Sequence, residues 1–414
     1  MPELVSETAK TCYLPGGITV IWFSMYLKAL NFLSPGHEKE METKNMKIEK
    51  TMRAISLLLV MALLGAVFVP AVSAESTEFA KDFVTPSLDL ESSVPLKEVN
   101  LPLSPISDES VFSISPGSII YHTDDGLTKV FDQQGKASFY VNDKDSAMIP
   151  TSAGVIKPAT FIHLVPTESH SYHKGNQTFV TDEKGNLILT IINEKAFELS
   201  GPEIQSNSKS NEWIEWAEDA SISSLTQFDA YWYVPDHPPS SESLEAIYLV
   251  NGISPYGGGP GIIQPVLEWN RPDTGTYWTA AAWGATTSGG DDIGSRIQVS
   301  EGDLLKGRLY WSDTYDQWYV QLSDLTTGTS STVWTDVVSG HTNLEAYVTL
   351  EGYNFDDDTD VPGDTEFYNM VFKNGGSTVT MSFSEYYGSM AQQLLSGLDV
   401  NIISGTDVEL KTAN

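Results

Sequence analysis

The sequence predicts an all-β protein, in which a small β-rich domain precedes a larger antiparallel β-sandwich or jelly roll. Short runs of apolar, β-branched and aromatic residues recur along most of the chain, and turns rich in Gly, Ser, Thr and Asp separate them. Many of these runs alternate apolar and polar residues, which is the period of a strand with one buried face. Nine of the ten tryptophans lie after residue 211, so the larger core is expected in the second half. Many short strands of this kind are typical of sandwiches.

Composition divides the 414 residues into six segments. In order, they are a mis-assigned start or non-structured extension (1–45), a signal peptide (46–74), an extended lead-in rich in Pro, Ser and Glu (75–110), the small β-rich domain (111–200), a polar linker (201–211) and the sandwich domain (212–414).

An apolar run after a basic start predicts export. Basic residues at positions 47, 50 and 53 precede the apolar run 55–69, and the small residues Val72 and Ala74 fit a cleavage site. We expect a secretory signal peptide that is cleaved near Ala74. The protein is then secreted or held at the cell surface, with no membrane contact beyond export.

The position of this signal peptide bears on the start of the chain. Signal peptides begin near the true N-terminus, so Met46 or Met52 is the expected start. The competing interpretation makes 13–33 a membrane span, although that run contains a proline, two glycines and a lysine.

The formal net charge of −32 at pH 7 narrows the partners. It disfavours nucleic acid and anionic membrane surfaces. A surface this acidic suits high salt or low pH, because protonated carboxylates no longer repel one another. The only cysteine, Cys12, precedes the expected cleavage site. The exported protein therefore has no disulfide, zinc thiolate or cysteine nucleophile.

The small β-rich domain is expected to contain five strands that alternate with turn signals such as "DDG" and "EKGN". These strands are 117–123, 137–143, 160–166, 177–182 and 186–192.

The sandwich domain is expected to contain eleven strands, followed by a short helix over 385–397 that ends at Gly397. These strands are 228–235, 243–253, 261–269, 277–285, 295–300, 304–313, 317–324, 331–337, 344–353, 365–373 and 377–384.

Common catalytic and metal-binding motifs are absent from the sequence. There is no nucleophile elbow, zinc-peptidase helix, P-loop or dinucleotide-binding loop. His170 and His173 are interpreted as surface residues and not as metal ligands. Asp356, Asp358 and Asp360 alternate in a loose calcium-like pattern, but the glycine and the final glutamate of an EF-hand loop are missing. Bulk acidity explains this run as well, so no metal or other cofactor is predicted.

Two predicted strands carry polar residues on one face. In 261–269, Gln264 and Glu268 are four residues apart and therefore point to the same side. In 344–353, alternate positions on one face include carboxylates and no basic residue: Glu345, Tyr347, Thr349 and Glu351.

Such a face has two interpretations. The simpler one is a solvated outer face. The other is a catalytic face, because clustered carboxylates raise one another's pKa and so suit a general acid and base that works in acid. A glutamine amide exchanges no proton, but its NH2 group donates hydrogen bonds to a developing oxyanion. A Gln and a Glu that flank one site could thus hydrolyse an amide without serine, cysteine, metal or an aspartate pair.

The order of segments between about 211 and 376 resembles the glutamic peptidases, also called eqolisins. "YWYVPDHPPSSES" resembles an early strand of the family that ends in Val-Pro, and "LVNGIS" stands where the family has Trp-Val-Gly-Ile-Asp. Gln264 follows Ser254 by ten residues, which is the spacing of the family's catalytic Gln. "VQLSDLTTGTSST" resembles the family's Asn-Leu-Thr-Thr-Gly segment. "NLEAYVTLEGY" stands where the family has Ala-Glu-Trp-Ile-Val-Glu, which aligns Glu345 with the catalytic Glu.

The resemblance implies a lectin-like, concanavalin-like sandwich. It implies that Gln264 and Glu345 hydrolyse peptide bonds of a polypeptide substrate in acid, without a cofactor. For the substrate cleft we name Glu268, Trp278, Trp283 and Tyr347, of which only Tyr347 shares the predicted face of Glu345. Because family members are secreted as preproproteins, the region 75–210 is interpreted as a propeptide or, alternatively, as an extra domain for surface attachment.

The sequence also departs from the family near the expected site. Val250 and Ser254 replace the family's Trp and Asp, and Ala346 replaces the Trp after the catalytic Glu. Pro265 follows the Gln where the family has Thr. A proline removes a strand hydrogen-bond donor, so we expect an edge strand or a bulge there. Glu351 could alternatively match the family's second Glu.

The tryptophan content supports a rival function. Trp232, Trp269 and Trp318 lie in strand contexts and are expected to be buried. Tryptophan on an open sheet face can stack on sugars, and a fold does not settle a function. The alternative is a non-catalytic, lectin-like sandwich that binds polysaccharide or a cell-surface partner.

Overall fold

The computed structural model describes residues 83, 85–88, 90, 97–98, 115–194, 210–240, 245–259, 261–286 and 289–414. All of them belong to one compact unit, Thr77–Asn414. The expected signal peptide and the segment before it lie outside the described residues, as do most of the lead-in and almost all of the linker. No helix of the described residues is long and apolar enough to cross a membrane.

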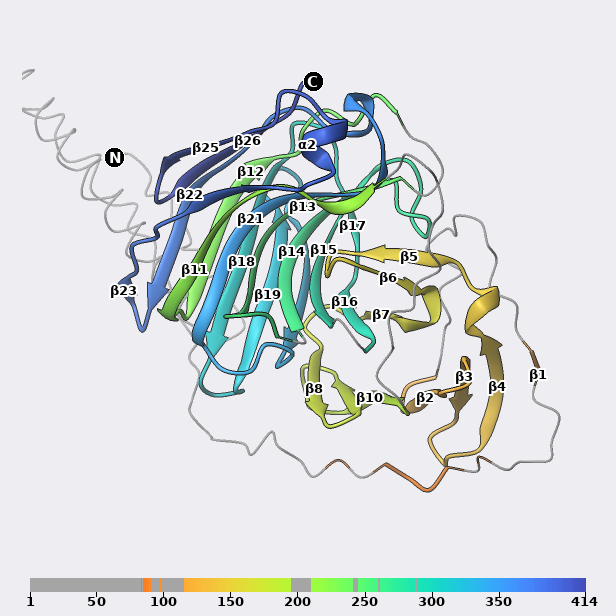
Figure 1. Ribbon diagram of the computed structural model, residues 1–414. Coiled ribbons are helices and arrows are strands. Elements are labelled where there is room, and N and C mark those ends of the chain that lie inside the picture. Colours follow the sequence, from red (N-terminus) through yellow and green to blue (C-terminus); the bar gives the residue numbers. More distant parts are fainter. Residues whose placement is uncertain are drawn as a thin grey trace, which may run out of the picture. The chain divides into compact units, whose positions relative to one another are not determined.

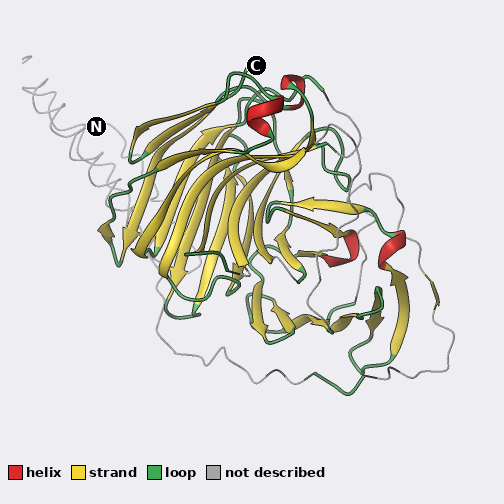
Figure 2. Cartoon of the chain, viewed as in Figure 1, coloured by secondary structure: helices red, strands yellow, loops and turns green. Residues whose placement is uncertain are grey.

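The described residues form an all-β fold, as predicted (Figure 2). Their helical segments are each three or four residues long: η2 (Asp143–Asp145), η3 (Ala159–Phe161), η4 (Asp358–Asp360) and α2 (Ala391–Leu394).

The front sheet forms one layer of the sandwich, in which β11, β21, β13, β14 and β15 lie side by side (Figure 1). Its spatial order is β24 (Ser384–Tyr387), β11 (Ser210–Ser224), β21 (Thr342–Phe355), β13 (Ala246–Pro255), β14 (Gly261–Trp269), β15 (Trp278–Thr286), β16 (Asp291–Gly294) and β7 (Ile162–Val165), with β17 (Ile297–Gln298) also paired to β15.

The back sheet begins with strands from the first half of the chain and ends with strands near the C-terminus. The first group is β1 (Lys97–Glu98), β4 (Ala137–Asn142), β3 (Leu127–Phe131), β2 (Ser118–His122), β10 (Leu187–Asn193), β9 (Gln177–Thr181) and β8 (His170–Lys174). The second group is β20 (Thr329–Thr335), β19 (Gln317–Asp324), β18 (Leu304–Ser312), β12 (Gln227–Tyr233), β22 (Thr365–Asn374), β26 (Asp407–Lys411) and β25 (Asp399–Ser404), with β23 (Ser377–Thr378) paired to β22. A separate hairpin consists of β5 (Met148–Thr151) and β6 (Val155–Pro158).

The main core lies between the two sheets. Strands β18 and β19 alternate buried and more exposed side chains, as the period-2 pattern of their sequence predicts. Trp232 and Trp318 are fully buried and Trp269 is nearly so, which confirms the expectation for these three residues. At Gly307 the sheets approach so closely that a Cβ atom would overlap side-chain atoms of Asn251 and Pro265 on the front sheet.

The expectation of an edge strand or bulge at Pro265 is wrong. Strand β14 lies inside the front sheet, with β13 on one side and β15 on the other. Its register with β15 is continuous through Pro265, and its pairing with β13 pauses between Val266 and Ile263 without a shift. The missing N–H therefore falls in a short gap of the ladder, which leaves the register unchanged.

The helix expected over 385–397 is mostly wrong as well. Residues Ser384–Tyr387 form β24, which pairs with Glu215–Glu218 of β11, and only Ala391–Leu394 is helical. An available edge at β11 outweighs the helical preference of the segment. The turn at Gly397 is present, with a φ of +73° that favours glycine.

Residues 115–194, which we call the N-terminal β unit, extend both sheets of the sandwich. Strand β7 pairs in parallel with β16, and β8 pairs in parallel with β20. The predicted turns "DDG" and "EKGN" are confirmed by positive φ angles at Gly126 and Gly185. The small β-rich part of the chain thus completes one edge of each sheet.

Candidate active site

Register brings the predicted Gln and Glu to one face of the front sheet. Gly252 of β13 pairs with Tyr347 of β21, and continuation of the β13–β14 register places Gln264 opposite the same glycine. Glu345 lies two residues before Tyr347 and pairs with Ser254. We call the side that faces away from the sandwich core the outer face. Gln264, Tyr347 and Glu345 all belong to it, because the residues between them on each strand lie in the core between the sheets.

Gln264 is held by Tyr347. The Gln264 side chain is fully buried, and its Nε2 donates a hydrogen bond of 3.0 Å to the Tyr347 hydroxyl. Gln264 Oε1 is buried and has no hydrogen-bond partner among the described residues. Burial raises the pKa of Tyr347 above its ordinary value, so the hydroxyl keeps its proton and can donate it to a further acceptor.

Glycine at position 252 makes this contact possible. A Cβ atom there would lie only 2.5 Å from the Tyr347 ring. The Tyr347 ring therefore crosses over the backbone of β13, which places its hydroxyl next to Gln264. A residue larger than glycine at position 252 would leave no room for the ring.

Glu345 is half-buried and is oriented by the end of β13. One carboxylate oxygen accepts a hydrogen bond from Ser254 Oγ at 3.2 Å, and the other accepts from the backbone N–H of Gly257 at 2.9 Å. Gly257 has a φ of +77°, which suits glycine in the turn that delivers this N–H. These two donors fix the carboxylate and leave it partly open to solvent.

Strand β11 adds aromatic and acidic residues that sequence analysis missed. The Trp213 ring lies 4.7 Å from the Tyr347 ring, and Trp216 Nε1 donates to Glu218 at 3.1 Å. Burial raises the pKa of Glu218, and the nearby charge of Glu345 acts in the same sense. Glu218 is thus a second carboxyl group near Glu345 that retains a proton more readily than an ordinary glutamate.

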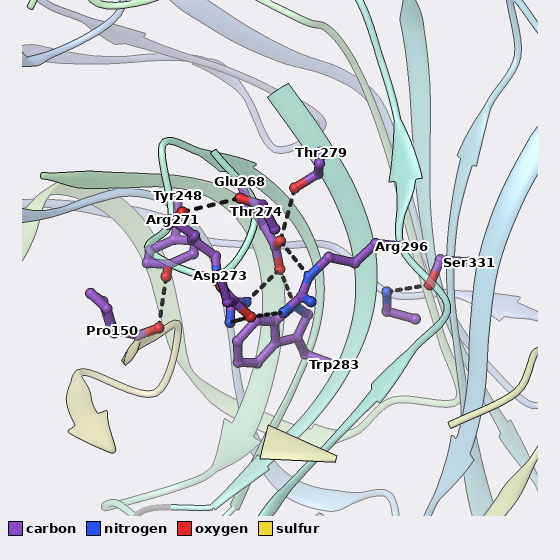
Figure 3. Close-up of polar contacts among 11 residues, drawn as sticks. Pro150, Tyr248, Glu268, Arg271, Asp273, Thr274, Thr279, Trp283, Arg296 and Ser331 are labelled. Atoms are coloured by element: carbon purple, nitrogen blue, oxygen red, sulfur yellow. Dashed lines mark hydrogen bonds and ion pairs between the residues drawn. The ribbon is translucent and has the colours of Figure 1, made fainter. Parts of the chain in front are cut away.

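Glu268 lies on the outer face inside a buried ion network (Figure 3). Its carboxylate accepts hydrogen bonds from Arg271 Nη1 at 3.1 Å and Arg296 Nε at 3.0 Å. It also accepts from Trp283 Nε1 at 2.6 Å and Thr279 Oγ1 at 3.0 Å. These four donors occupy Glu268, so it is arranged to hold the sheet and not to meet a ligand directly.

The two tryptophans named for the cleft lie on opposite faces. Trp283 is the cross-strand neighbour of Gln264 and shares the outer face with Glu268. Trp278 packs in the core between the sheets, with its ring 5.3 Å from that of Trp269. Of the residues named from the sequence, the outer face therefore brings together Gln264, Glu268, Trp283, Glu345 and Tyr347, and it does not include Trp278.

Glu351 lies further along the same face and is fully buried. Burial raises its pKa to about 8, with weaker opposing contributions from Tyr353, the Gly154 backbone and Trp213. At acidic pH this group is a neutral carboxylic acid. The outer face is thus covered at one end and half-open at Glu345.

The histidines and the acidic loop singled out from the sequence form different kinds of contact. The interpretation of His170 as a surface residue is wrong, because its side chain is buried. His170 Nδ1 lies 2.8 Å from Gln317 Oε1, and His173 Nδ1 lies 2.7 Å from Asp336 Oδ1. In the acidic loop, carboxylates of Asp356, Asp357 and Asp360 lie close enough to share a cation. Asp360 Oδ2 there accepts the backbone N–H groups of Asp356 and Asp357, as a loop-capping carboxylate does.

The contacts that sequence analysis missed have two causes. Ser254 lies on β13 opposite Glu345, and Gly257 lies in the turn that follows β13. Strand periodicity gives neither the pairing of β13 with β21 nor the direction of that turn. Trp213 and Glu218 lie on β11, whose register shifts three times against β21. A bulge moves the following side chains to the opposite phase, so the alternating pattern is interrupted. The dense run "EWIEWAED" beside a predicted sandwich was the available signal.

Comparisons with known proteins give only distant structural likenesses. No protein-family model and no curated protein matches the chain. The chain is similar to the crystal structure of scytalido-glutamic peptidase with a peptide-based transition-state analogue, at 19% identity and a TM-score of 0.37, over 49% of this chain and 100% of that one. It is similar to SCP-B, a member of the eqolisin family of peptidases, in complex with the tripeptide Ala-Ile-His, at 18% identity and a TM-score of 0.36, over 49% and 100%. It is also similar to aspergilloglutamic peptidase from Aspergillus niger, at 21% identity and a TM-score of 0.32, over 42% and 100%.

The contact between Tyr347 and Gln264 gives a testable consequence. Gly252→Ala is expected to displace the Tyr347 ring and break its hydrogen bond to Gln264, because the new Cβ would overlap the ring. Increased mobility of the Gln264 amide in NMR spectra would report the loss. Gly363→Ala is the matched control, since the new Cβ there would meet its first neighbour at 3.6 Å, an ordinary contact. An unchanged Gln264 amide signal in Gly252→Ala would contradict the arrangement.

Proposed function

We propose that this chain is a secreted acid endopeptidase that hydrolyses peptide bonds with Gln264 and Glu345. The observation that carries the proposal is the joint placement of these side chains on one face, with Gln264 fixed by Tyr347 and Glu345 fixed by Ser254 and Gly257. The half-exposed Glu345 is the group that a substrate and a water molecule can reach first.

The proposed chemistry needs one group that carries a proton and one group that donates a hydrogen bond to the developing oxyanion. Glu345 takes a proton from water as the water attacks the peptide carbonyl, and then gives that proton to the departing amine. The Gln264 amide donates to the carbonyl oxygen as negative charge develops there. Tyr347 orients that amide, and its own hydroxyl proton is available for a second hydrogen bond to the same oxygen.

Acidic operation follows from the role of Glu345 in the second step. A general acid must be protonated when the amine leaves, so the balance of the two steps favours a pH near the pKa of a glutamate. Burial raises the pKa of both Glu218 and Glu351, so at that pH they place less negative charge against the oxyanion than ordinary glutamates would.

An acid proteolysis assay tests the proposal. The exported protein is incubated with denatured protein substrate from pH 2 to 6 in the presence of pepstatin, beside Glu345→Gln and Gln264→Ala. We expect cleavage by the wild type, a loss of about 10²–10⁴ in kcat for Glu345→Gln, and a loss of about 10²–10³ for Gln264→Ala. Folding of each variant is checked by circular dichroism. Equal activity in both variants and the wild type would refute the Gln/Glu mechanism.

Tyr347→Phe separates positioning from direct chemistry. It removes the acceptor of Gln264 Nε2 but keeps the ring over Gly252. We expect kcat to fall by about fivefold, with little change in KM, because a hydrogen bond of roughly 1 kcal/mol that orients the amide is lost. A change in KM alone would assign Tyr347 to ground-state binding instead.

A second candidate function is polysaccharide binding, which one surface feature favours. The Trp216 ring stacks on Tyr386 at 5.3 Å and an interplanar angle of 16°, and Tyr386 is 41% exposed. Aromatic faces of this kind suit the apolar faces of sugars. Glycan binding that is lost in Trp216→Ala, without proteolysis at any pH, would favour this function over the peptidase.

A further inference from the structure

The N-terminal β unit covers part of the outer face. Tyr248, Val250, Val266, Trp283 and Tyr353 belong to a buried apolar cluster of that face. The residues of the N-terminal β unit that pack against this cluster are Ala153, Ile156, Ile162 and Leu164. Val266 lies two residues from Gln264 on the same face, and Trp283 is the cross-strand neighbour of Gln264. The cover therefore borders a glutamine that has no exposed surface.

Two tyrosines of the outer face bind main-chain carbonyls of this cover. Tyr248 Oη donates to the Pro150 carbonyl at 2.8 Å, and Tyr353 Oη donates to the Thr151 carbonyl at 2.7 Å. Figure 3 shows Tyr248 turned toward Pro150 beside the Glu268 network. Burial raises the pKa of both tyrosines, so both remain donors at any working pH. The two accepting carbonyls are consecutive in the extended strand β5.

One buried ion pair anchors the cover. Lys157 of β6 is fully buried, and its ammonium lies 2.6 Å from Asp291 Oδ1 of β16. It also donates to the backbone carbonyls of Thr286 and Gly289, which precede that strand. All three partners belong to the sandwich, so the hairpin is fixed where β6 leads into the edge strand β7.

We propose that Tyr248 and Tyr353 form a binding site for the main chain of an extended polypeptide, and that the hairpin β5–β6 is its internal occupant. This proposal rests on the proposed function and concerns the same face. Hydroxyl donors that bind consecutive carbonyls recognise backbone and not side-chain identity, as a protein-degrading site requires. While the hairpin is bound, a polypeptide substrate cannot reach this end of the face, so the wild type cleaves its substrate more slowly than a form whose hairpin is released.

The occupant can be released by one substitution. Lys157→Met keeps the apolar stem of the side chain and removes the ammonium, which leaves Asp291 buried without its cation. Lys184→Met, in an exposed turn of the same unit, is the matched control. Hydrogen exchange of residues 148–158 and 246–250 reports release without any need for catalysis. We expect exchange at least tenfold faster in Lys157→Met than in Lys184→Met.

Binding of a labelled peptide with the sequence of residues 147–158 then tests the tyrosines. We expect Lys157→Met to bind it at least tenfold more tightly than the wild type, because the internal hairpin no longer competes. Adding Tyr248→Phe and Tyr353→Phe to this variant should weaken binding by roughly twentyfold, at about fivefold for each lost hydrogen bond. Tyr310→Phe, on an exposed site of the back sheet, should change nothing. If Lys157→Met does not fold, Ala153→Glu, which places a charge against the same cluster, replaces it.

The outcomes separate this proposal from the peptidase. Faster exchange and tyrosine-dependent peptide binding, without proteolysis at any pH, would support the binding site and refute the catalytic function. Proteolysis that is equally fast in the wild type and Lys157→Met would overturn inhibition by the hairpin. Peptide binding that is unchanged in the double Phe variant would overturn the assignment of Tyr248 and Tyr353.

Discussion

Glu268→Gln is expected to destabilise the protein by about 3–5 kcal/mol at pH 7, which is the cost of removing one partner from a buried ion pair. Glutamine has nearly the same size, so the change removes charge and leaves little cavity. Arg271 and Arg296 then share Asp273 as their remaining carboxylate partner. Arg271 and Glu268 are completely shielded from solvent, so water does not compensate for the lost charge.

Guanidinium unfolding at pH 7 measures this effect. Glu366→Gln, at an exposed position of β22, is the matched control and should change the free energy of unfolding by less than about 0.5 kcal/mol. Arg296→Met in the Glu268→Gln background should recover part of the loss, because it removes the excess positive charge. A cost for Glu268→Gln that equals the control would show that the network contributes nothing to stability.

This network gives Glu268 partners that were not expected for a cleft residue. Its face was predicted correctly, since Gln264 and Glu268 are four residues apart on one strand. Arg271 follows after the strand, and Arg296 is 28 residues away from Glu268. Strand periodicity gives the direction of a side chain but not the identity of what meets it across a loop, so the ionic partners could not be deduced.

The pairing of Gln264 with Glu345 shows the opposite case. Both residues were predicted to lie on the polar faces of two strands, and period 2 alone places them outside the core. The contact through Tyr347 depends on an additional fact, the glycine at 252 in the strand between them. A glycine inside a strand pattern signals close approach of another group. The sequence contained this signal, but it did not identify which residue approaches the glycine.

The fold class was predictable because short alternating strands and turn glycines are local features. The covering of the outer face was not, because it depends on contacts between residues far apart in the chain, such as Lys157 with Asp291. The sequence offered a solvated face or a catalytic face. The structure has a third arrangement, in which polar residues of β14 are fully buried beneath another part of the same chain.

Burial of acidic side chains also makes the protein's stability depend on pH. Burial raises the pKa of Glu215 on β11 to about 9, with added repulsion from Asp364 and Asp399. The pKa of Asp292 is raised to about 6, again by burial. The buried pair His122 and His163 acts in the opposite sense, since burial lowers the pKa of His163 to about 3. Single-site variants are therefore needed to separate these groups.

Glu215→Gln is expected to stabilise the protein by about 3 kcal/mol at pH 7 and to change its stability little at pH 4. A carboxyl group whose pKa is higher in the folded state than in the unfolded state contributes fully below the unfolded value of 4.5. That contribution is lost as the pH rises from 4.5 toward 9. Glutamine stays neutral throughout and avoids the loss.

Thermal or guanidinium unfolding at both pH values, with Glu366→Gln as the exposed control, measures the difference. Destabilisation by Glu215→Gln at pH 7 would show that the charged carboxylate is satisfied in the folded state. The expected result would instead place the protein's greater stability in acid, where the proposed peptidase works.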